Sequence, residues 1–198
     1  MKPSLPAFQL ESGAEFLELI ELPLTTIKLD WFGQASVADC QFALAKSETH
    51  LFFRAIVHKA PIENLDCVSG EFCEGLWKFD CAEFFISDHK GESYQEFNIA
   101  PQGAWWNAEF EAYRRQTKAA ADIGVKIYSK KDAGQWEVGL SVPLLKLGLK
   151  PERANVSFVL INADGQPQYV SFTNFSVKDP DFHLVSEFPS IAWSTHEV

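Results

Sequence analysis

Apolar and polar residues alternate with a period of two along most of the chain, which is the pattern of half-buried β-strands. Several such runs are separated by short polar turns, and each pair of runs predicts a β-hairpin. The paired runs are 39–46 with 51–58, 80–86 with 93–99, 123–128 with 136–141, and 155–162 with 168–174. The last pair flanks Asp164-Gly165, a dipeptide that strongly favours a hairpin turn.

Hairpins at this spacing predict an all-β protein, an antiparallel β-sandwich of about ten strands with at most one short helix. The helix is expected within residues 107–121, where Ala and Glu are frequent, although an irregular strand is the alternative there. The 198 residues suffice for one well-packed core. We therefore expect residues 1–14 to form a loose leader and residues 15–198 to form a single domain.

The hairpin at 80–86 and 93–99 fixes which side chains share a face of the sheet. Because side chains alternate between faces, one face carries the apolar residues Ala82, Phe84, Ile86, Phe97 and Ile99, which we expect in the core. The other face carries aromatic and polar residues together, including Glu83 and Glu96.

Two carboxylates so close together repel each other unless a cation, a donor or water lies beside them. We predict that Arg54, Arg114 or Arg115 lies within ion-pair distance of Glu83 or Glu96. The alternatives are two ordinary solvated strand residues, or a pair that shares a proton or binds a ligand.

The stretch that starts at Trp77, WKFDCAEFF, fits the W-x-x-D-x-x-E-x-F run of family 9 carbohydrate-binding modules and resembles the wider group of DOMON-like β-sandwiches. The following EFNIAPQGAWW resembles bacterial DOMON-like proteins. The resemblance covers roughly residues 20–193. It implies the sandwich fold above and a site for a small ligand, with a carbohydrate as the first expectation.

In family 9 modules two aromatic rings clasp the sugar, and the resemblance implies that Trp77 is the first ring. The second falls at Phe182, where Phe replaces the Trp of the family, and Asn98 stands where sugar-binding members carry Arg. Aromatic faces stack on the C–H surface of a sugar while carboxylates and amides bind its hydroxyls. The predicted ligand-binding residues are Trp77, Asp80, Glu83, Glu96, Asn98 and Phe182. Core packing is the alternative for Trp77, and a turn role is the alternative for Asp80.

The sequence contains no common catalytic motif and no Cys-x-x-Cys pair, so an enzyme is less expected than a binding protein. Haem-binding relatives use a Met ligand, and the only Met is Met1, so haem is not expected. Structural calcium, which family members can carry, is compatible with acidic residues such as Asp179 and Asp181. No other cofactor is predicted.

The net charge of −10 argues against binding to nucleic acids or anionic membranes, which require clustered Lys and Arg. The first residues show no secretory signal, so we expect a cytoplasmic protein with reduced cysteines. Cys67 and Cys73 flank a short loop and would be able to close a disulfide in an oxidising compartment.

These patterns predict a non-catalytic module that binds a small ligand, with a carbohydrate as the leading candidate. The alternative is a protein-interaction or scaffold domain of the same fold, and no protein partner is identified. A concave pocket lined by aromatic rings would favour the first hypothesis, whereas a flat apolar patch would favour the second.

Overall fold

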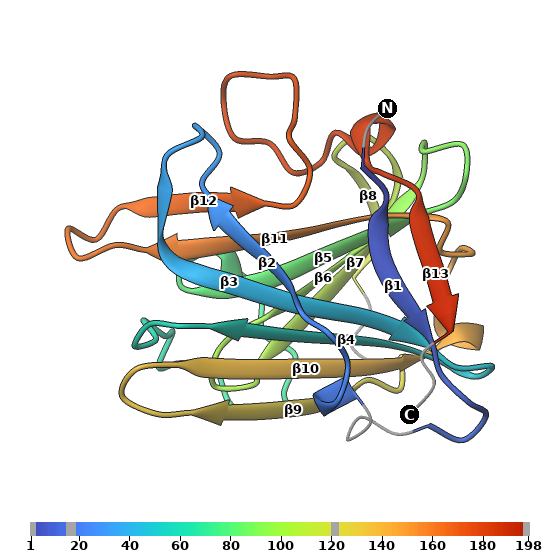
Figure 1. The fold of residues 1–198 in the computed structure, drawn as a ribbon, viewed down its shortest axis with the longest axis horizontal. Coiled ribbons are helices and arrows are strands. Elements are labelled where there is room, and N and C mark those ends of the chain that lie inside the picture. Colours follow the sequence, from blue (N-terminus) through green and yellow to red (C-terminus); the bar gives the residue numbers. More distant parts are fainter. Residues whose placement is uncertain (1–2, 15–18, 120–122, 196–198) are drawn as a thin grey trace.

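The computed structural model describes residues 3–14, 19–119 and 123–195, which fold into two sheets packed face to face (Figure 1). The larger sheet contains β1 (Leu5–Gln9), β2 (Thr25–Leu29), β3 (Ala35–Lys46), β4 (His50–Val57), β9 (Lys126–Lys131), β10 (Trp136–Pro143) and β13 (Ile191–Thr195). The smaller sheet contains β5 (Cys81–Ser87), β6 (Tyr94–Ile99), β7 (Trp105–Ala112), β8 (Arg115–Ala119), β11 (Arg153–Ile161) and β12 (Pro167–Ser171). The predicted β-sandwich is confirmed, with thirteen strands in the described residues where about ten were expected.

The strand order of the seven-stranded sheet is β13-β1-β3-β4-β10-β9, with β2 paired to β3 beside this path. The six-stranded sheet has the order β12-β11-β5-β6-β7-β8. The four predicted hairpins are confirmed as the antiparallel pairs β3–β4, β5–β6, β9–β10 and β11–β12. Gly165, in the turn between β11 and β12, has a φ of 76°, a conformation that glycine adopts without steric cost.

The helix expected at residues 107–121 is wrong for the described part of that segment, which belongs to β7 and β8. Residues 120–122 lie outside the described part. β7 pairs with β6 in register from Tyr94 opposite Phe110 to Ile99 opposite Trp105. Strand pairing and the burial of alternate side chains therefore outweigh the helical preference of Ala and Glu. The described residues contain single 3₁₀ turns, η2 (Leu76–Lys78), η3 (Leu144–Lys146) and η4 (Val185–Glu187). No helix in the described ranges is long and apolar enough to span a membrane.

The loose leader expected at residues 1–14 is also incorrect, because β1 lies within it. β1 pairs in parallel with β13 from Leu5 opposite Ile191 to Gln9 opposite Thr195, and it also pairs with β3. Leu5 and Ala7 are fully buried in the core. The burial of Leu5 and Ala7 holds this segment against the sandwich. Because its partner β13 is so distant in the sequence, no local sequence pattern indicates the pairing.

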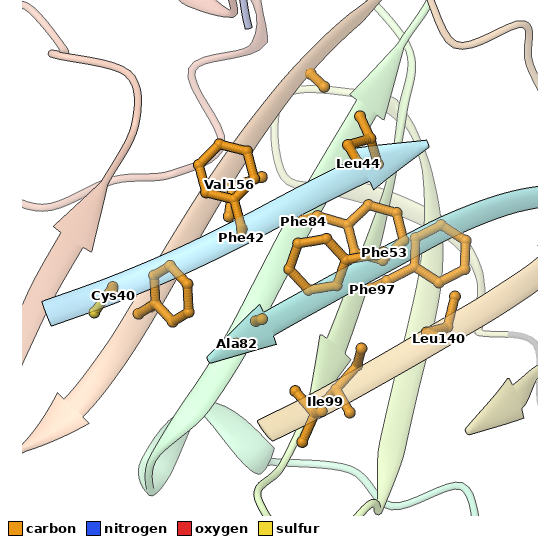
Figure 2. Packing of buried hydrophobic residues seen from close by; sticks show 14 of the residues in the cluster. Cys40, Phe42, Leu44, Phe53, Ala82, Phe84, Phe97, Ile99, Leu140 and Val156 are labelled. Carbon is orange, nitrogen blue, oxygen red and sulfur yellow. The ribbon is translucent and has the colours of Figure 1, made fainter. Parts of the chain in front are cut away.

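The main core fills the space between the two sheets (Figure 2). The strands β3, β4 and β10 supply Phe42, Phe53 and Leu140, which face Phe84 of β5 and Phe97 of β6. The rings of Phe84 and Phe97 stack with their centroids 4.6 Å apart. The face expected in the core from the alternation, Ala82, Phe84, Ile86, Phe97 and Ile99, is confirmed as fully buried there.

The outer face of the seven-stranded sheet is covered by a second apolar cluster. Leu19 and Leu22 pack on Ala43, Ala45 and Phe52. Next to this cluster Arg54 Nε donates to Glu137 Oε1 at 2.8 Å. The part of this face around Arg54 and Glu137 is therefore closed by a segment of the same chain, whereas the outer face of the six-stranded sheet is partly open.

Candidate functional site

A cleft of about 460 Å³ opens on the outer face of the six-stranded sheet. Strand residues form its floor, and the segments around Trp77 and Phe182 border it. The residues that line it are Glu74, Trp77, Glu83, Glu96, Trp106, Phe110, Arg114, Gln116, Val159, Tyr169, Pro180, Asp181, Phe182 and His183. Its size matches the usual range for small-molecule sites. Four of the six predicted site residues line this one cleft.

Two carboxylates, Glu83 of β5 and Glu96 of β6, lie in the floor of the cleft. They are only 3% and 5% exposed, respectively. The oxygen Oε2 of Glu83 accepts a long hydrogen bond from Ser157 Oγ at 3.5 Å. Glu96 Oε1 accepts one from Asn98 Nδ2 at 2.9 Å. Both carboxylates are thus removed from bulk water with little compensating hydrogen bonding.

Burial shifts the titration of both groups in the same direction. Burial raises the pKa of Glu83 well above its ordinary value of 4.5, and the nearby charge of Glu96 raises it further. Burial also raises the pKa of Glu96 to about 7, against the lowering effects of the Asn98 hydrogen bond and the charge of Arg114. The pair therefore retains protons at a pH where solvated glutamates have lost them.

The prediction that an arginine forms an ion pair with Glu83 or Glu96 is wrong for the described residues. Arg54 binds Glu137 on the other sheet, and Arg115 Nε lies 2.7 Å from Glu111 Oε1. Arg114 lines the cleft, but its Nη2 binds Asp181 Oδ1 at 2.9 Å. Sequence alternation places a side chain on a face, but it does not select the partner of a long cationic side chain.

His183 connects the carboxylates to Tyr94. The Tyr94 hydroxyl lies 2.7 Å from His183 Nδ1 and accepts the backbone N–H of Arg114 at 3.1 Å. Burial raises the pKa of Tyr94, so the hydroxyl keeps its proton and donates it to Nδ1. The ring proton of a neutral His183 is then on Nε2, which lies 3.9 Å from Glu96 Oε2.

The same burial, assisted by the charge of Arg114, lowers the pKa of His183 to about 4. The imidazole is therefore neutral at pH 7 and supplies no positive charge to the carboxylates. The cluster offers a ligand one N–H donor beside two acidic groups.

Aromatic side chains form the walls of the cleft. Trp77, in η2, is 39% exposed, and its ring meets that of Trp106 edge to face at 5.3 Å. Phe182 is buried by the rings of Trp31, Phe85 and Tyr169. Trp77 thus has a ring face available for stacking, whereas the ring of Phe182 is largely covered. The two residues do not form the pair of equally open rings that the resemblance implied.

The other two predicted site residues, Asp80 and Asn98, do not line the cleft. Asp80 is fully buried, forms an ion pair with Lys59, and accepts the N–H groups of Ile62 at 2.8 Å and Ile161 at 2.7 Å. It therefore fixes the start of β5 to its neighbours. Asn98 lies opposite Glu83 in the β5–β6 pair and holds Glu96 in place, and its buried Oδ1 has no hydrogen-bond partner among the described atoms.

A disulfide lies near the rim, in the loop that leads to Glu74 and Trp77. Cys67 and Cys73 are bonded to each other, so the expectation of reduced cysteines is wrong for this pair. Both pack against the apolar cluster beneath the cleft. Disulfides are typical of oxidising compartments, and the cytoplasmic location of this chain stays a prediction. Cys40 and Cys81 are free and buried.

The sequence interpretation missed several residues of the cleft, among them Tyr169, Asp181 and His183. Tyr169 alternates along β12 with a core residue, Val170, so its outward direction was available from the pattern. Asp181 and His183 belong to an irregular segment, and periodicity gives no information there. Among the described residues, no group of three or more His, Cys, Asp or Glu side chains is arranged to hold a metal ion.

Comparison with known proteins shows similarity at the level of the fold. No family model matches the sequence, and no curated protein matches it. A candidate carbohydrate-binding protein from Bacteroides uniformis has a TM-score of 0.75 and 16% sequence identity, over 98% of this chain and 100% of its own. A family 9 carbohydrate-binding module from Caldicellulosiruptor kristjanssonii in complex with cellotriose has a TM-score of 0.63 and 12% identity, over 97% of this chain and 95% of its own.

A structure of a family 9 module from Caldicellulosiruptor kristjanssonii with glucose gives a TM-score of 0.61 at 12% identity, over 97% of both chains. The chain thus has a fold like that of family 9 carbohydrate-binding modules, as the W-x-x-D-x-x-E-x-F run implied. The similarity to the wider DOMON-like group stays a prediction.

Proposed function

We infer that this chain is a non-catalytic carbohydrate-binding module and that the sugar lies in the cleft of the six-stranded sheet. The observation that carries the proposal is the position of Trp77, whose partly exposed ring borders the same cleft as the buried Glu83 and Glu96. A sugar ring presents C–H groups to an aromatic face and hydroxyls to acceptors and donors at its edge.

The polar groups of the cleft suit hydroxyl recognition. Glu83 and Glu96 accept hydrogen bonds when ionised and also donate one when protonated, and His183 offers an Nε2–H donor. The similarity in fold to modules solved with glucose and cellotriose supports a saccharide as the ligand class. The concave, aromatic shape meets the criterion that favours ligand binding over a flat interface.

The first test is a calorimetric titration with glucose, cellotriose and a panel of other saccharides. Replacing Trp77 by Ala should weaken binding by about 2 kcal/mol, or about thirtyfold, because it removes the stacking surface. Its melting temperature should change little, since the ring is partly exposed. The matched control is Phe32→Ala, which removes a ring that is 61% exposed outside the cleft and should leave affinity unchanged.

Absence of binding to every saccharide by the wild-type protein would overturn the proposal. The protein-interaction hypothesis would then lead, because Leu29, Phe32 and Val37 are exposed apolar residues around the β2–β3 connection. Phe32→Ala would be expected to reduce association with a partner or with a second copy, measured by analytical ultracentrifugation.

A further inference from the structure

The cleft contains more negative than positive side chains. Glu74, Glu83, Glu96 and Asp181 line it, and Arg114 is its one Lys or Arg among the described lining residues. Arg114 is committed to Asp181, and the Tyr113 hydroxyl also donates to this Asp at 2.5 Å. The charge of the arginine is therefore balanced before any ligand enters.

Glu83 and Glu96 have no ion-pair partner of their own in the described protein except the distant contact of Glu96 with neutral His183. Glu83 is almost completely buried and lines the cleft, and its one side-chain hydrogen bond among the described residues is the long one from Ser157 Oγ at 3.5 Å. A carboxyl group that is so little exposed and so weakly hydrogen-bonded is poorly solvated, so a donor from a ligand in the cleft would stabilise its charged form.

A buried carboxylate pair without a cation distinguishes ligands by charge. A neutral hydroxyl donates one hydrogen bond but brings no positive charge to stabilise the ionised form of either carboxyl group. An ammonium group donates up to three hydrogen bonds and neutralises charge, and such charge-assisted bonds are roughly twice as strong as neutral ones.

The walls of the cleft favour the same kind of ligand. The faces of Trp and Tyr rings attract cations through their π electrons, and Trp77 and Tyr169 both border the cleft. The same ring surfaces are suited to stacking on a sugar, so a cation attached to a sugar ring would use both properties.

We propose that the cleft selects a saccharide unit with a free amino group, whose ammonium pairs with Glu83 and Glu96 while its ring stacks on Trp77. This inference rests on the proposed carbohydrate-binding function and narrows the ligand to amino sugars. The single positive charge of the ammonium takes the place of one proton that the carboxyl pair holds in the free protein, and this proton leaves to the solvent. Binding is therefore coupled to proton release near neutral pH.

The experiment compares three ligands by isothermal titration calorimetry at pH 7, namely glucosamine, glucose and N-acetylglucosamine. Glucose is the matched ligand with a hydroxyl in place of the amino group, and the acetylated sugar lacks the positive charge. We expect glucosamine to bind about tenfold or more tightly than glucose, because an ammonium–carboxylate pair replaces a neutral contact. Repeating the titration in buffers of different ionisation enthalpy should reveal proton release for glucosamine alone.

The variants Glu83→Gln and Glu96→Gln keep the shape of each side chain and remove its charge. Each should reduce the preference for glucosamine over glucose severalfold while binding of glucose persists. The control is Glu48→Gln, the same substitution at an exposed position in the turn between β3 and β4, which should have no effect. Melting curves verify that each variant is folded.

The outcomes separate this inference from the proposed function. Equal affinity for glucosamine and glucose would overturn the amino-sugar inference and leave carbohydrate binding intact. Failure of all three sugars, together with the wider saccharide panel, would overturn carbohydrate binding itself. A preference for glucosamine that survives in both Gln variants would place the ammonium elsewhere and would also overturn the inference.

Discussion

The outer faces of the two sheets both bury carboxylates, but only one of them provides a cation. On the seven-stranded sheet Glu137 accepts from Arg54 at 2.8 Å, and Arg54 Nη1 also binds the carbonyl groups of Leu19 and Ile20, each at 3.2 Å. On the six-stranded sheet Glu83 and Glu96 have no arginine or lysine partner within the described chain. The first face uses its charges to attach a covering segment, and the second leaves its charges facing a cleft.

This difference separates a structural charge from one available to a ligand. Both faces have glutamates at alternating strand positions, so the local sequence does not distinguish them. The distinction comes from whether the protein itself completes the polar interactions of the buried group. When the protein itself makes all the polar interactions of a buried group, the group stabilises the fold. When some of these interactions are missing, a ligand can supply them and gain binding energy.

The largest expected effect comes from removing the cation of the closed face. Arg54→Ala leaves Glu137 buried without a partner and also releases the carbonyl groups of Leu19 and Ile20. We expect a loss of about 3–5 kcal/mol in the free energy of unfolding, measured by urea denaturation. A loss below about 1 kcal/mol would show that water reaches Glu137 and that this face is not closed.

On the open face, the carboxyl groups without a cation partner should make the free energy of unfolding depend on pH. The pKa of Glu96 is raised to about 7 in the folded protein, against 4.5 ordinarily. Between these values the unfolded chain has released the proton and the folded chain keeps it, so the free energy of unfolding falls as pH rises. Glu83, with its raised pKa, acts in the same direction.

His183 acts in the opposite direction. Its pKa is lowered from 6.5 to about 4, so between these pH values the unfolded chain holds the extra proton and stability rises with pH. The variant with both Glu83→Gln and Glu96→Gln keeps the contribution of His183 and loses those of the two carboxyl groups. From pH 4.5 to 7 the wild-type protein should lose on the order of 3 kcal/mol relative to the double variant, as measured by urea denaturation at several pH values. Parallel pH profiles for the two proteins would show that the carboxylates titrate normally.

The smallest effect is expected for an ion pair that lies outside both buried environments. Glu111 and Arg115 are joined at 2.7 Å, but both side chains are more than half exposed. Glu111→Gln should change the free energy of unfolding by less than about 1 kcal/mol, because water solvates the separated charges well. A thermal denaturation scan at low and high salt measures this effect, and a loss comparable to that of Arg54→Ala would invalidate burial as the cause of the difference.

Sequence periodicity predicted the sandwich because strands alternate their side chains between two environments. The same alternation placed Phe84 and Phe97 in the core and Glu83 and Glu96 together on the other face, both of which the structure confirms. These are local properties of one hairpin. The same pattern also indicated that two carboxylates share this face.

Long-range partners were not predictable from local patterns. Arg54 pairs with a residue 83 positions away in sequence, and Asp181 is brought to Arg114 by an irregular segment. Asp80 matches a motif position, yet its role is to fix neighbouring backbone, which only the positions of Lys59, Ile62 and Ile161 reveal. The direction in which a strand side chain points follows from the sequence pattern. The identity of its interaction partner depends on how the whole chain packs.

The pairing of β1 with β13 has a consequence for the order of folding. Leu5 lies opposite Ile191, so much of the pairing of β1 must wait until nearly the whole described chain has been synthesised. The strands β5, β6, β7 and β8 follow one another in sequence and pair as neighbours, so they can assemble earlier. The part of the cleft floor that carries Glu83 and Glu96 would then form before the opposite sheet is complete, and Phe182 and His183 would close over it only late in synthesis.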